Sequence, residues 1–221
     1  MRAPAMSSAP AYRLGNMSKV TCQISISLDG YMAGPDQSVD NPLGVGGEQL
    51  HQWYFGDGGA SAADAQVKEH LLEGNGAYIL GRNMFGPIRG DWGDLSWRGW
   101  WGEDPPYHTP VFVLTHYERE PLEMEGGTTF HFVTGGLDEA LERARAAAGP
   151  DRNVAIGGGA STLNQAFAAG ALDEVYLHHS PLVLGAGERL FDGLDTPPTL
   201  EIVETIASPA TTHVRYRVVR S

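Results

Sequence analysis

The sequence predicts an α/β fold in which a mostly parallel sheet is covered by helices. Through the middle of the chain, short apolar runs typical of strands alternate with helix-like segments, which favours parallel strands joined by helices. The last two apolar runs, 199–206 and 211–219, flank Ser208-Pro209 and predict an antiparallel hairpin. Residues 18–221 contain no linker-like stretch and no internal repeat, so we expect one domain.

Charge and composition exclude several classes of partner. The chain of 221 residues carries 27 acidic and 15 basic side chains, a formal net charge of −12. Because lysine and arginine form no cluster, neither nucleic acid nor an anionic membrane surface is an expected partner. No apolar run approaches the roughly 18 residues of a membrane span. The single cysteine, Cys22, excludes an intrachain disulfide, which fits a cytoplasmic protein.

The N-terminal segment reads as a tail followed by a strand. Residues 1–16 are rich in alanine, proline and serine and lack the apolar core of a secretory signal, so we expect a flexible tail before a domain over 17–221. Residues 19–28 alternate apolar and polar side chains, which predicts a strand with one covered face. The pair Asp29-Gly30 ends it, and a polar, glycine-rich loop extends to Gly47; loops of this length are often functional.

The elements that follow are predicted from apolar periodicity and from glycine and proline stops. The second helix is expected to bury Val67, Leu71 and Leu72. Metal ligation is not expected, because no cysteine or histidine grouping has zinc spacing. In chain order the predicted elements are helices 48–55 and 62–73, strands 77–80, 110–115 and 129–133, helix 138–148, strand 154–156, helix 161–168 and a strand over 173–179.

The segment 85–109 has an unusual density of tryptophan. Trp92, Trp97, Trp100 and Trp101 lie among glycine, aspartate and proline, in a stretch that cannot form a regular element. The segment is either a loop folded on its own aromatic cluster or an aromatic wall beside a ligand pocket.

A run of three glycines, Gly157-Gly158-Gly159, separates a buried strand from a helix. Backbone N–H groups at such a helix start attract anions, above all phosphate. We therefore expect the turn either to hold the pyrophosphate of a dinucleotide or to be a tight turn without a ligand. It lacks the third glycine of the Rossmann fingerprint and comes late in the chain. Arg82, at another strand end, is either a phosphate ligand or a surface ion-pair partner.

Several motifs occur in an order that closely resembles the dihydrofolate reductase-like family. The nearest branch resembles the reductase domain of the bifunctional riboflavin-biosynthesis deaminase/reductase and its stand-alone bacterial relatives. This resemblance covers residues 18–221 and implies a three-layer fold with about eight strands, NADPH across the strand C-termini, and a homodimer. The motifs are Ser27-Leu28-Asp29-Gly30, residues 79–85, Val113-Leu114-Thr115-His116, Ile156-Gly157-Gly158-Gly159, Asp173-Glu174-Val175 and residues 181–187 with Leu190-Phe191.

The resemblance also implies which residues bind NADPH. They lie at the ends of four strands and in the loop after the first. They are Gly157, Gly158, Gly159, Ala160, Ser161 and Thr162 for the pyrophosphate; Gly81, Arg82 and Asn83 for the adenosine 2′-phosphate; Thr115 and His116 beside the adenine ribose; and Ser25, Ser27 and Met32 near the nicotinamide.

The implied activity is hydride transfer from NADPH to a C=N or C=O bond of a small heterocycle, pterin-like or pyrimidine-like. The carboxylate that supports protonation in dihydrofolate reductases has no clear match. Asp29, Glu48 and His51 are the candidates, although each also suits an ordinary role as a turn stabiliser, a helix-start residue or a half-exposed histidine. Two alternatives stay open: a non-catalytic nucleotide-binding module, and a reductase that uses a flavin or deazaflavin.

Overall fold

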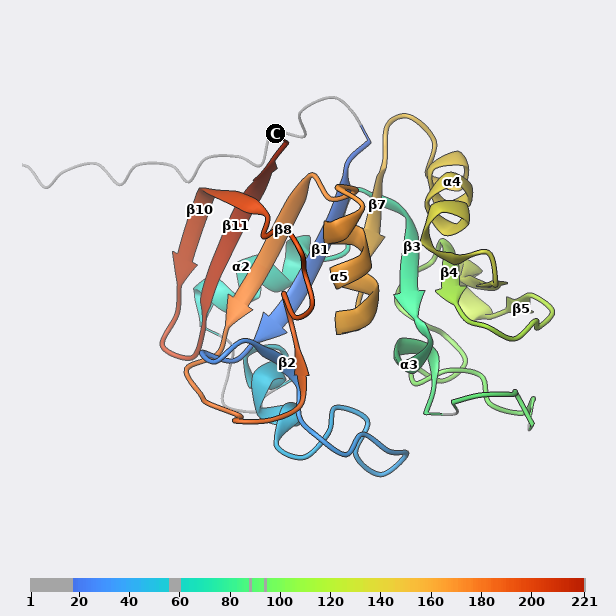
Figure 1. The fold of residues 1–221 in the computed structure, drawn as a ribbon, viewed down its shortest axis with the longest axis horizontal. Helices are drawn as coiled ribbons and strands as arrows, with labels where there is room; N and C mark the ends of the chain where they lie inside the picture. The colour runs from blue at the N-terminus through green and yellow to red at the C-terminus, as the bar shows by residue number, and fades with distance from the viewer. Residues whose placement is uncertain (1–17, 56–60, 88, 94, 221) are drawn as a thin grey trace, which may run out of the picture.

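A nine-stranded mixed sheet forms the centre of the computed structural model, which describes residues 18–55, 61–87, 89–93 and 95–220 (Figure 1). The predicted tail, 1–16, lies outside the described residues. Across the sheet the strands are β10 (Thr199–Ala207), β11 (Thr212–Val219), β8 (Glu174–His179), β1 (Val20–Ile26), β7 (Asn153–Ile156), β3 (Asn75–Gly81), β4 (Pro110–Leu114), β6 (Thr129–Val133) and β5 (Leu122–Glu123).

The strand directions confirm the predicted sheet. The six strands from β8 to β6 are all parallel, whereas β11, β10 and β5 are antiparallel to their neighbours. The C-terminal hairpin is the pair β10–β11, as predicted. A second sheet, β2 (Tyr31–Ala33) with β9 (Glu188–Arg189), was not predicted, since such short strands carry no periodic signal. It joins the loop after β1 to the segment after β8.

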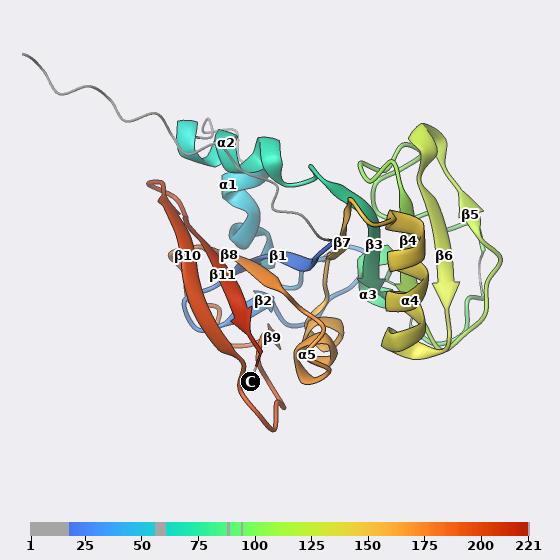
Figure 2. The same cartoon turned by 90° about the horizontal axis from the view of Figure 1, so that it is seen from above.

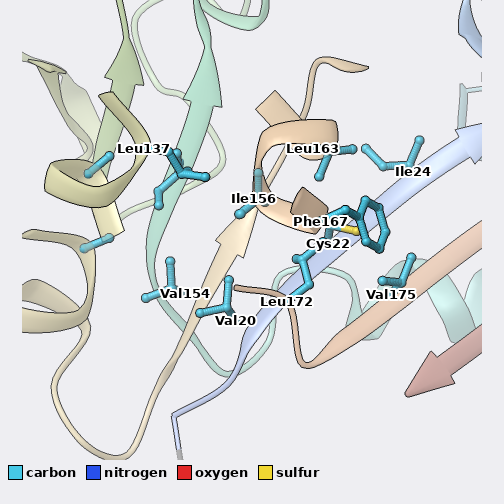
Figure 3. Close-up of a cluster of buried hydrophobic side chains, with 14 of the residues drawn as sticks. Val20, Cys22, Ile24, Leu137, Val154, Ile156, Leu163, Phe167, Leu172 and Val175 are labelled. Atoms are coloured by element: carbon cyan, nitrogen blue, oxygen red, sulfur yellow. The ribbon is translucent and has the colours of Figure 1, made fainter. Parts of the chain in front are cut away.

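Helices cover both faces of the sheet (Figure 2). On one face lie α4 (Gly136–Ala148) and α5 (Ala160–Ala168). On the other lie α2 (Ala62–His70), α1 (Gln52–Phe55) and the 3-10 helix η1 (Gly47–His51). The α4/α5 face encloses the main core, where Cys22 and Ile24 of β1 and Ile156 of β7 meet Leu163 and Phe167 of α5 (Figure 3). This core fixes the C-terminal ends of β1 and β7 relative to the start of α5.

Helix α2 differs from its prediction. Ser61 caps its start, and its backbone ends at His70. Leu72 is 41% exposed, while Val67 and Leu71 are only partly buried, so the predicted apolar face is wrong. The one fully buried side chain among the described residues of this helix is Asp64. The helix packs through a polar contact, because Asp64 meets a buried histidine of β11.

A second cluster lies on the face opposite α4, over β3, β4 and β6. It contains Trp92 with Phe85, Phe130 and Phe132, whose rings meet edge to face. Within the described ranges, no helix has both the length and the apolarity needed to cross a membrane.

Candidate functional site

The glycine turn after β7 contacts the turn after β3 directly. Gly81 N–H donates to the Gly158 carbonyl at 2.7 Å, and Gly157 N–H donates to the Ile79 carbonyl at 2.9 Å. A Cβ on Gly81 would lie 2.7 Å from Thr162 Oγ1 and 3.1 Å from the Gly159 nitrogen. Glycine at position 81 therefore lets the two predicted phosphate-binding turns form one continuous backbone surface.

Gly159, which is half-buried, is the point of this surface with open space in front of its Cα. It precedes α5 with φ −83° and ψ −165°, a conformation open to any residue, and a Cβ built there meets nothing within 4 Å. Gly159 provides no side-chain cap for the helix. The N–H groups of the first turn are therefore not satisfied by the residue at the N-cap position. Ala160 and Thr162 are buried, whereas Ser161 is exposed. The turn has the geometry of an anion-binding helix start.

Arg82 begins helix α3 (Arg82–Phe85), directly after β3. Its guanidinium lies 3.0 Å from the centroid of a Trp92 ring, and it donates to Thr115 Oγ1 at 3.2 Å. Burial, together with repulsion from the neighbouring Arg119, lowers the pKa of Arg82 to about 10. The structure therefore brings together Arg82, predicted for the 2′-phosphate, and Thr115, predicted beside the adenine ribose.

Arg119 is a second cation at this place, and it was not among the predicted ligands. Its guanidinium lies 4.9 Å from the same Trp92 ring and 5.1 Å from Phe132. It comes from the loop between β4 and β5, and no motif marks it. Two other predicted residues lie nearby with less defined roles: His116 is exposed, and Asn83 accepts the Trp100 indole N–H through its carbonyl at 3.0 Å.

The tryptophan segment mainly forms an aromatic cluster. Trp92 is buried as the platform for Arg82, and the Trp97 and Trp100 indoles donate to the carbonyls of Phe85 and Asn83. Trp101 is 44% exposed. A cavity of about 660 Å³ lies further out, and none of the four tryptophans lines it; its residues include Arg119, Phe132, Thr134, Glu139 and Arg143. Trp100 instead borders a cavity of about 10 Å³ with Asn83 and Gln37.

The residues predicted near the nicotinamide are placed by β1 and the loop after it. Ser25 and Ser27 share one face of the strand, since strand side chains alternate. Ser25 is buried and accepts the Trp53 indole N–H at 3.0 Å. Met32 is 8% exposed and belongs to the main core. Ser25 therefore lies beneath α1 rather than at the open surface.

Asp29 holds two loops together. Its Oδ1 accepts the Ser27 hydroxyl at 2.6 Å and the Leu184 N–H at 3.1 Å, and its Oδ2 accepts the Gly185 N–H at 2.7 Å. The Ser27 hydrogen bond is the main reason that the pKa of Asp29 falls to about 2, with the backbone bonds to Gly185 and Leu184 adding to it. An ionised carboxylate used in this way favours a structural anchor over a proton donor.

The other two candidate proton donors are poorly suited as well. Glu48, in the first turn of η1, is exposed. His51 is partly covered, and burial lowers its pKa to about 4, so the imidazole is neutral near pH 7. A neutral imidazole with this pKa is a weak source of protons at neutral pH.

A buried network of Asp64, His213 and His178 was missed from the sequence. It lies under Trp53, on the same face of the sheet as Ser25. The only local signal is the spacing Ser61-x-x-Asp64, which marks a helix start. His178 and His179 are adjacent in the strand predicted over 173–179, so their side chains are expected on opposite faces. Nothing in the sequence indicates a partner for either.

Solved structures define the class of fold. The chain resembles a protein from Shewanella sp. PV-4 assigned to riboflavin biosynthesis, with TM-score 0.62, 22% identity and coverage of 91% of this chain and 99% of that one. It also resembles a pyrimidine reductase-like protein from Corynebacterium diphtheriae, with TM-score 0.53, 14% identity and coverage of 92% and 93%. These likenesses establish the fold, which is the α/β fold predicted above.

A larger relative shows the same fold in part of its chain. It is the diaminohydroxyphosphoribosylaminopyrimidine deaminase/5-amino-6-(5-phosphoribosylamino)uracil reductase from Thermotoga maritima, matched with TM-score 0.53 and 17% identity. The match covers 92% of this chain and 57% of the Thermotoga chain. The comparison with curated proteins gave no match.

The family is established by the sequence. The family model of the RibD C-terminal domain matches residues 18–214. The chain belongs to the RibD C-terminal domain family. This confirms the resemblance stated above.

Proposed function

We propose that the protein is an NADPH-dependent reductase that transfers a hydride to a C=N or C=O bond of a small heterocycle, pyrimidine-like or pterin-like. The observation that carries this proposal is the joined surface formed by the Gly159 turn and the Arg82–Arg119 pair at neighbouring strand ends. Family membership supports it, since the solved structures that share the fold include a pyrimidine reductase-like protein and a bifunctional deaminase/5-amino-6-(5-phosphoribosylamino)uracil reductase.

The arginine pair supports NADPH over NADH. Arg82 and Arg119 pack against one indole ring, and their mutual repulsion contributes to the lowered pKa of Arg82. A bound phosphate dianion would relieve that repulsion, and guanidinium groups suit it because they can donate two parallel hydrogen bonds. In a chain of net charge −12, two adjacent cations mark the place where a dianion is tolerated.

The start of α5 suits the pyrophosphate. Its backbone N–H groups and the helix dipole favour an anion, and the missing side chain at Gly159 leaves room for one to approach. Gly81 keeps this turn against the Arg82 turn, so both phosphate positions lie along one edge of the sheet.

The protein's part in the reaction is alignment and exclusion of water. When bound, the reduced nicotinamide supplies the hydride. The ends of β1 and β7 would seat its ring, and the loop anchored by Asp29 would border the substrate. We infer that the Trp100 segment and the loop around Gln37 form the substrate side, because residues of both segments border one gap beside Asn83.

NADPH oxidation against a panel of pyrimidine-like and pterin-like C=N and C=O compounds tests the proposal. We expect turnover with at least one compound, and NADPH binding tighter than NADH binding. Tight NADPH binding without turnover of any compound would instead support a nucleotide-binding module. Turnover that requires added flavin or deazaflavin would replace the proposed cofactor.

A further inference from the structure

Three buried side chains from separate elements form one hydrogen-bonded chain. Asp64 lies in the first turn of α2, His213 on β11 and His178 on β8. Asp64 Oδ1 lies 2.9 Å from His213 Nε2, and His213 Nδ1 lies 2.9 Å from His178 Nδ1. Their exposed fractions are 2%, 5% and 3% respectively. Burying three polar side chains costs free energy unless they form hydrogen bonds. The hydrogen bonds among these three residues offset that cost only in this geometry.

The carboxylate at one end is fixed from both sides. Asp64 Oδ2 accepts the Ser61 hydroxyl at 2.8 Å and the Ser61 N–H at 3.2 Å, while Oδ1 faces His213. Burial opposes ionisation of Asp64, but hydrogen bonds from His213, Ser208 and Ser61 outweigh it, and the pKa of Asp64 is lowered. Asp64 is therefore the ionised end of the chain.

The contacts determine where the protons lie. An ionised carboxylate only accepts hydrogen bonds, so His213 Nε2 carries a hydrogen. In a neutral His213, Nδ1 is then an acceptor, and His178 Nδ1 must be the donor. His178 Nε2 is left with a lone pair. Within the described part of the chain this nitrogen is buried and has no hydrogen-bond partner.

The unpartnered nitrogen belongs to the residue next to Ser25. In the sheet register, His178 of β8 pairs with Ser25 of β1 on one side and with His213 of β11 on the other. The Trp53 ring lies 4.6 Å from His178 and 4.8 Å from His213, and its N–H donates to Ser25. The hydrogen-bonded chain therefore runs across the sheet from α2 toward the strand expected to face the nicotinamide.

We propose that Asp64, His213 and His178 form a proton relay that supplies, through His178 Nε2, the proton needed for the reduction. This inference rests on the proposed function, because hydride transfer to C=N or C=O leaves a nitrogen or oxygen that must gain a proton. Asp29, Glu48 and His51 do not fill that role well, for the reasons given above. Since Nε2 is buried, the Trp53 side chain must turn away from the imidazoles when a substrate binds.

The proton transfer balances without a further reactant. In the loaded relay, His213 is an imidazolium paired with ionised Asp64 and donates through Nδ1 to His178, whose Nε2 carries a hydrogen. When the substrate carbon is reduced, His178 Nε2–H would pass its proton to the substrate nitrogen or oxygen. His178 Nδ1 takes the proton of His213 Nδ1. Both imidazoles are then neutral, and a proton from water reloads Nε2.

The surroundings disfavour a positive charge on His178. Burial lowers the pKa of His178 to about 3, and the neighbouring imidazoles of His213, His51 and His179 add to this. His178 is neutral near pH 7, as His51 is, but it is hydrogen-bonded to His213, which lies against the Asp64 carboxylate and can replace the proton that His178 gives up. A metal centre is a poor alternative, because no three His, Cys, Asp or Glu side chains of the described residues are placed to hold an ion.

The first test needs neither cofactor nor substrate. Ring-nitrogen spectra of histidine-labelled wild-type protein, recorded above neutral pH, report which nitrogen of each imidazole carries hydrogen. We expect hydrogen on Nδ1 of His178 and on Nε2 of His213. Hydrogen on Nε2 of His178 in the neutral form would overturn the relay, because Nδ1 could then not donate to His213.

The second test is the pH dependence of turnover. In Asp64→Asn the imidazolium loses its counter-ion, so we expect kcat to fall about 100-fold near neutral pH. The decline of turnover with rising pH should also move to lower pH, while NADPH affinity stays the same. His213→Gln should lose the same activity. His131→Gln is the matched control, since His131 stacks on Phe112 far across the sheet.

The outcomes separate the two proposals. Wild-type protein that does not oxidise NADPH with any compound overturns the proposed function. Wild-type protein that turns over, while Asp64→Asn keeps the same rate and the same pH dependence, overturns the relay alone.

Discussion

For Arg82, the sequence predicted the position at a strand end correctly but did not predict the side chains that surround it. Its place after a buried strand is a local property of the sequence, and the structure puts it beside Thr115 as expected. The Trp92 platform lies 10 residues further along the chain than Arg82, and the second cation, Arg119, lies 37 residues further along. Contacts of that kind depend on loop conformation, which apolar periodicity does not report.

Replacing Arg82 by alanine should separate NADPH from NADH. A charge-assisted hydrogen bond contributes roughly 1.5–3 kcal/mol, so we expect NADPH affinity to fall roughly 10- to 100-fold. NADH affinity should change little, since it lacks the 2′-phosphate. Equilibrium titration with both nucleotides measures the difference, with the exposed Arg145→Ala on α4 as control. Equal losses for both nucleotides would contradict a role at the 2′-phosphate.

Gly159→Ala separates binding from folding. The new Cβ meets open space, and φ of −83° suits alanine, so we expect a melting temperature close to that of wild type. NADPH affinity should fall by at least about 10-fold, which corresponds to about 1.4 kcal/mol. Gly81→Ala is the contrasting variant: its Cβ would lie 2.7 Å from Thr162 Oγ1 and should destabilise the fold. If Gly159→Ala binds NADPH normally, the pyrophosphate lies elsewhere.

At the level of elements, the loop after β8 depends on Asp29. Because hydrogen bonds to the ionised form lower its pKa to about 2, the anchor is complete above the unfolded pKa of 3.8 and is lost as the pH falls through about 2. We expect Asp29→Ala to speed amide hydrogen exchange at Leu184 and Gly185 at neutral pH, without a similar change in β8. Unchanged exchange at these two amides would show that other contacts hold the loop.

Helix α2 shows where element prediction failed. Its start at Ala62 was predicted correctly, but its end was placed three residues beyond His70, and its buried face was wrong. The buried contact joins Asp64 to His213, which lies 149 residues away in sequence. His213 in turn contacts His178 on the neighbouring strand, 35 residues away in sequence. A buried polar contact is invisible to a pattern that assumes apolar inner faces. The same reason hid the proposed relay.

The whole molecule should lose stability in mild acid, in part through His51. Burial lowers its folded pKa to about 4, so below pH 6.5 the unfolded chain binds a proton that the folded chain does not. Stability therefore falls as the pH drops from 6.5 toward 4. Between pH 7 and pH 5 this residue should account for up to about 2 kcal/mol of the loss.

Urea unfolding of wild type and His51→Gln at both pH values measures that contribution. The variant should lose less free energy of unfolding between pH 7 and pH 5 than wild type. His70→Gln is the control, because His70 lies near the surface beside Glu73. Equal losses in wild type and His51→Gln would show that His51 titrates normally in the folded protein.

The overall architecture was the most predictable feature. Alternating strands and helices specify a parallel sheet, and glycine turns specify where its strands end, so the cofactor edge follows from local patterns. The substrate side depends on long loops and on the tryptophan segment, whose packing comes from many distant contacts. That is why the sequence offered specific candidates for phosphate binding, whereas it offered no clear match for the proton donor.

The central position of β1 also affects how the chain is made. Strand β1 is paired with β7 and β8, whose contacting residues lie about 130 to 155 positions later, as in Val20 with Val154 and Ile26 with His179. Until most of the chain has been synthesised, this apolar strand has no partner for either edge. The centre of the sheet therefore cannot form until β7 and β8 have been synthesised, and until then the chain carries an exposed apolar strand that chaperones would need to shield.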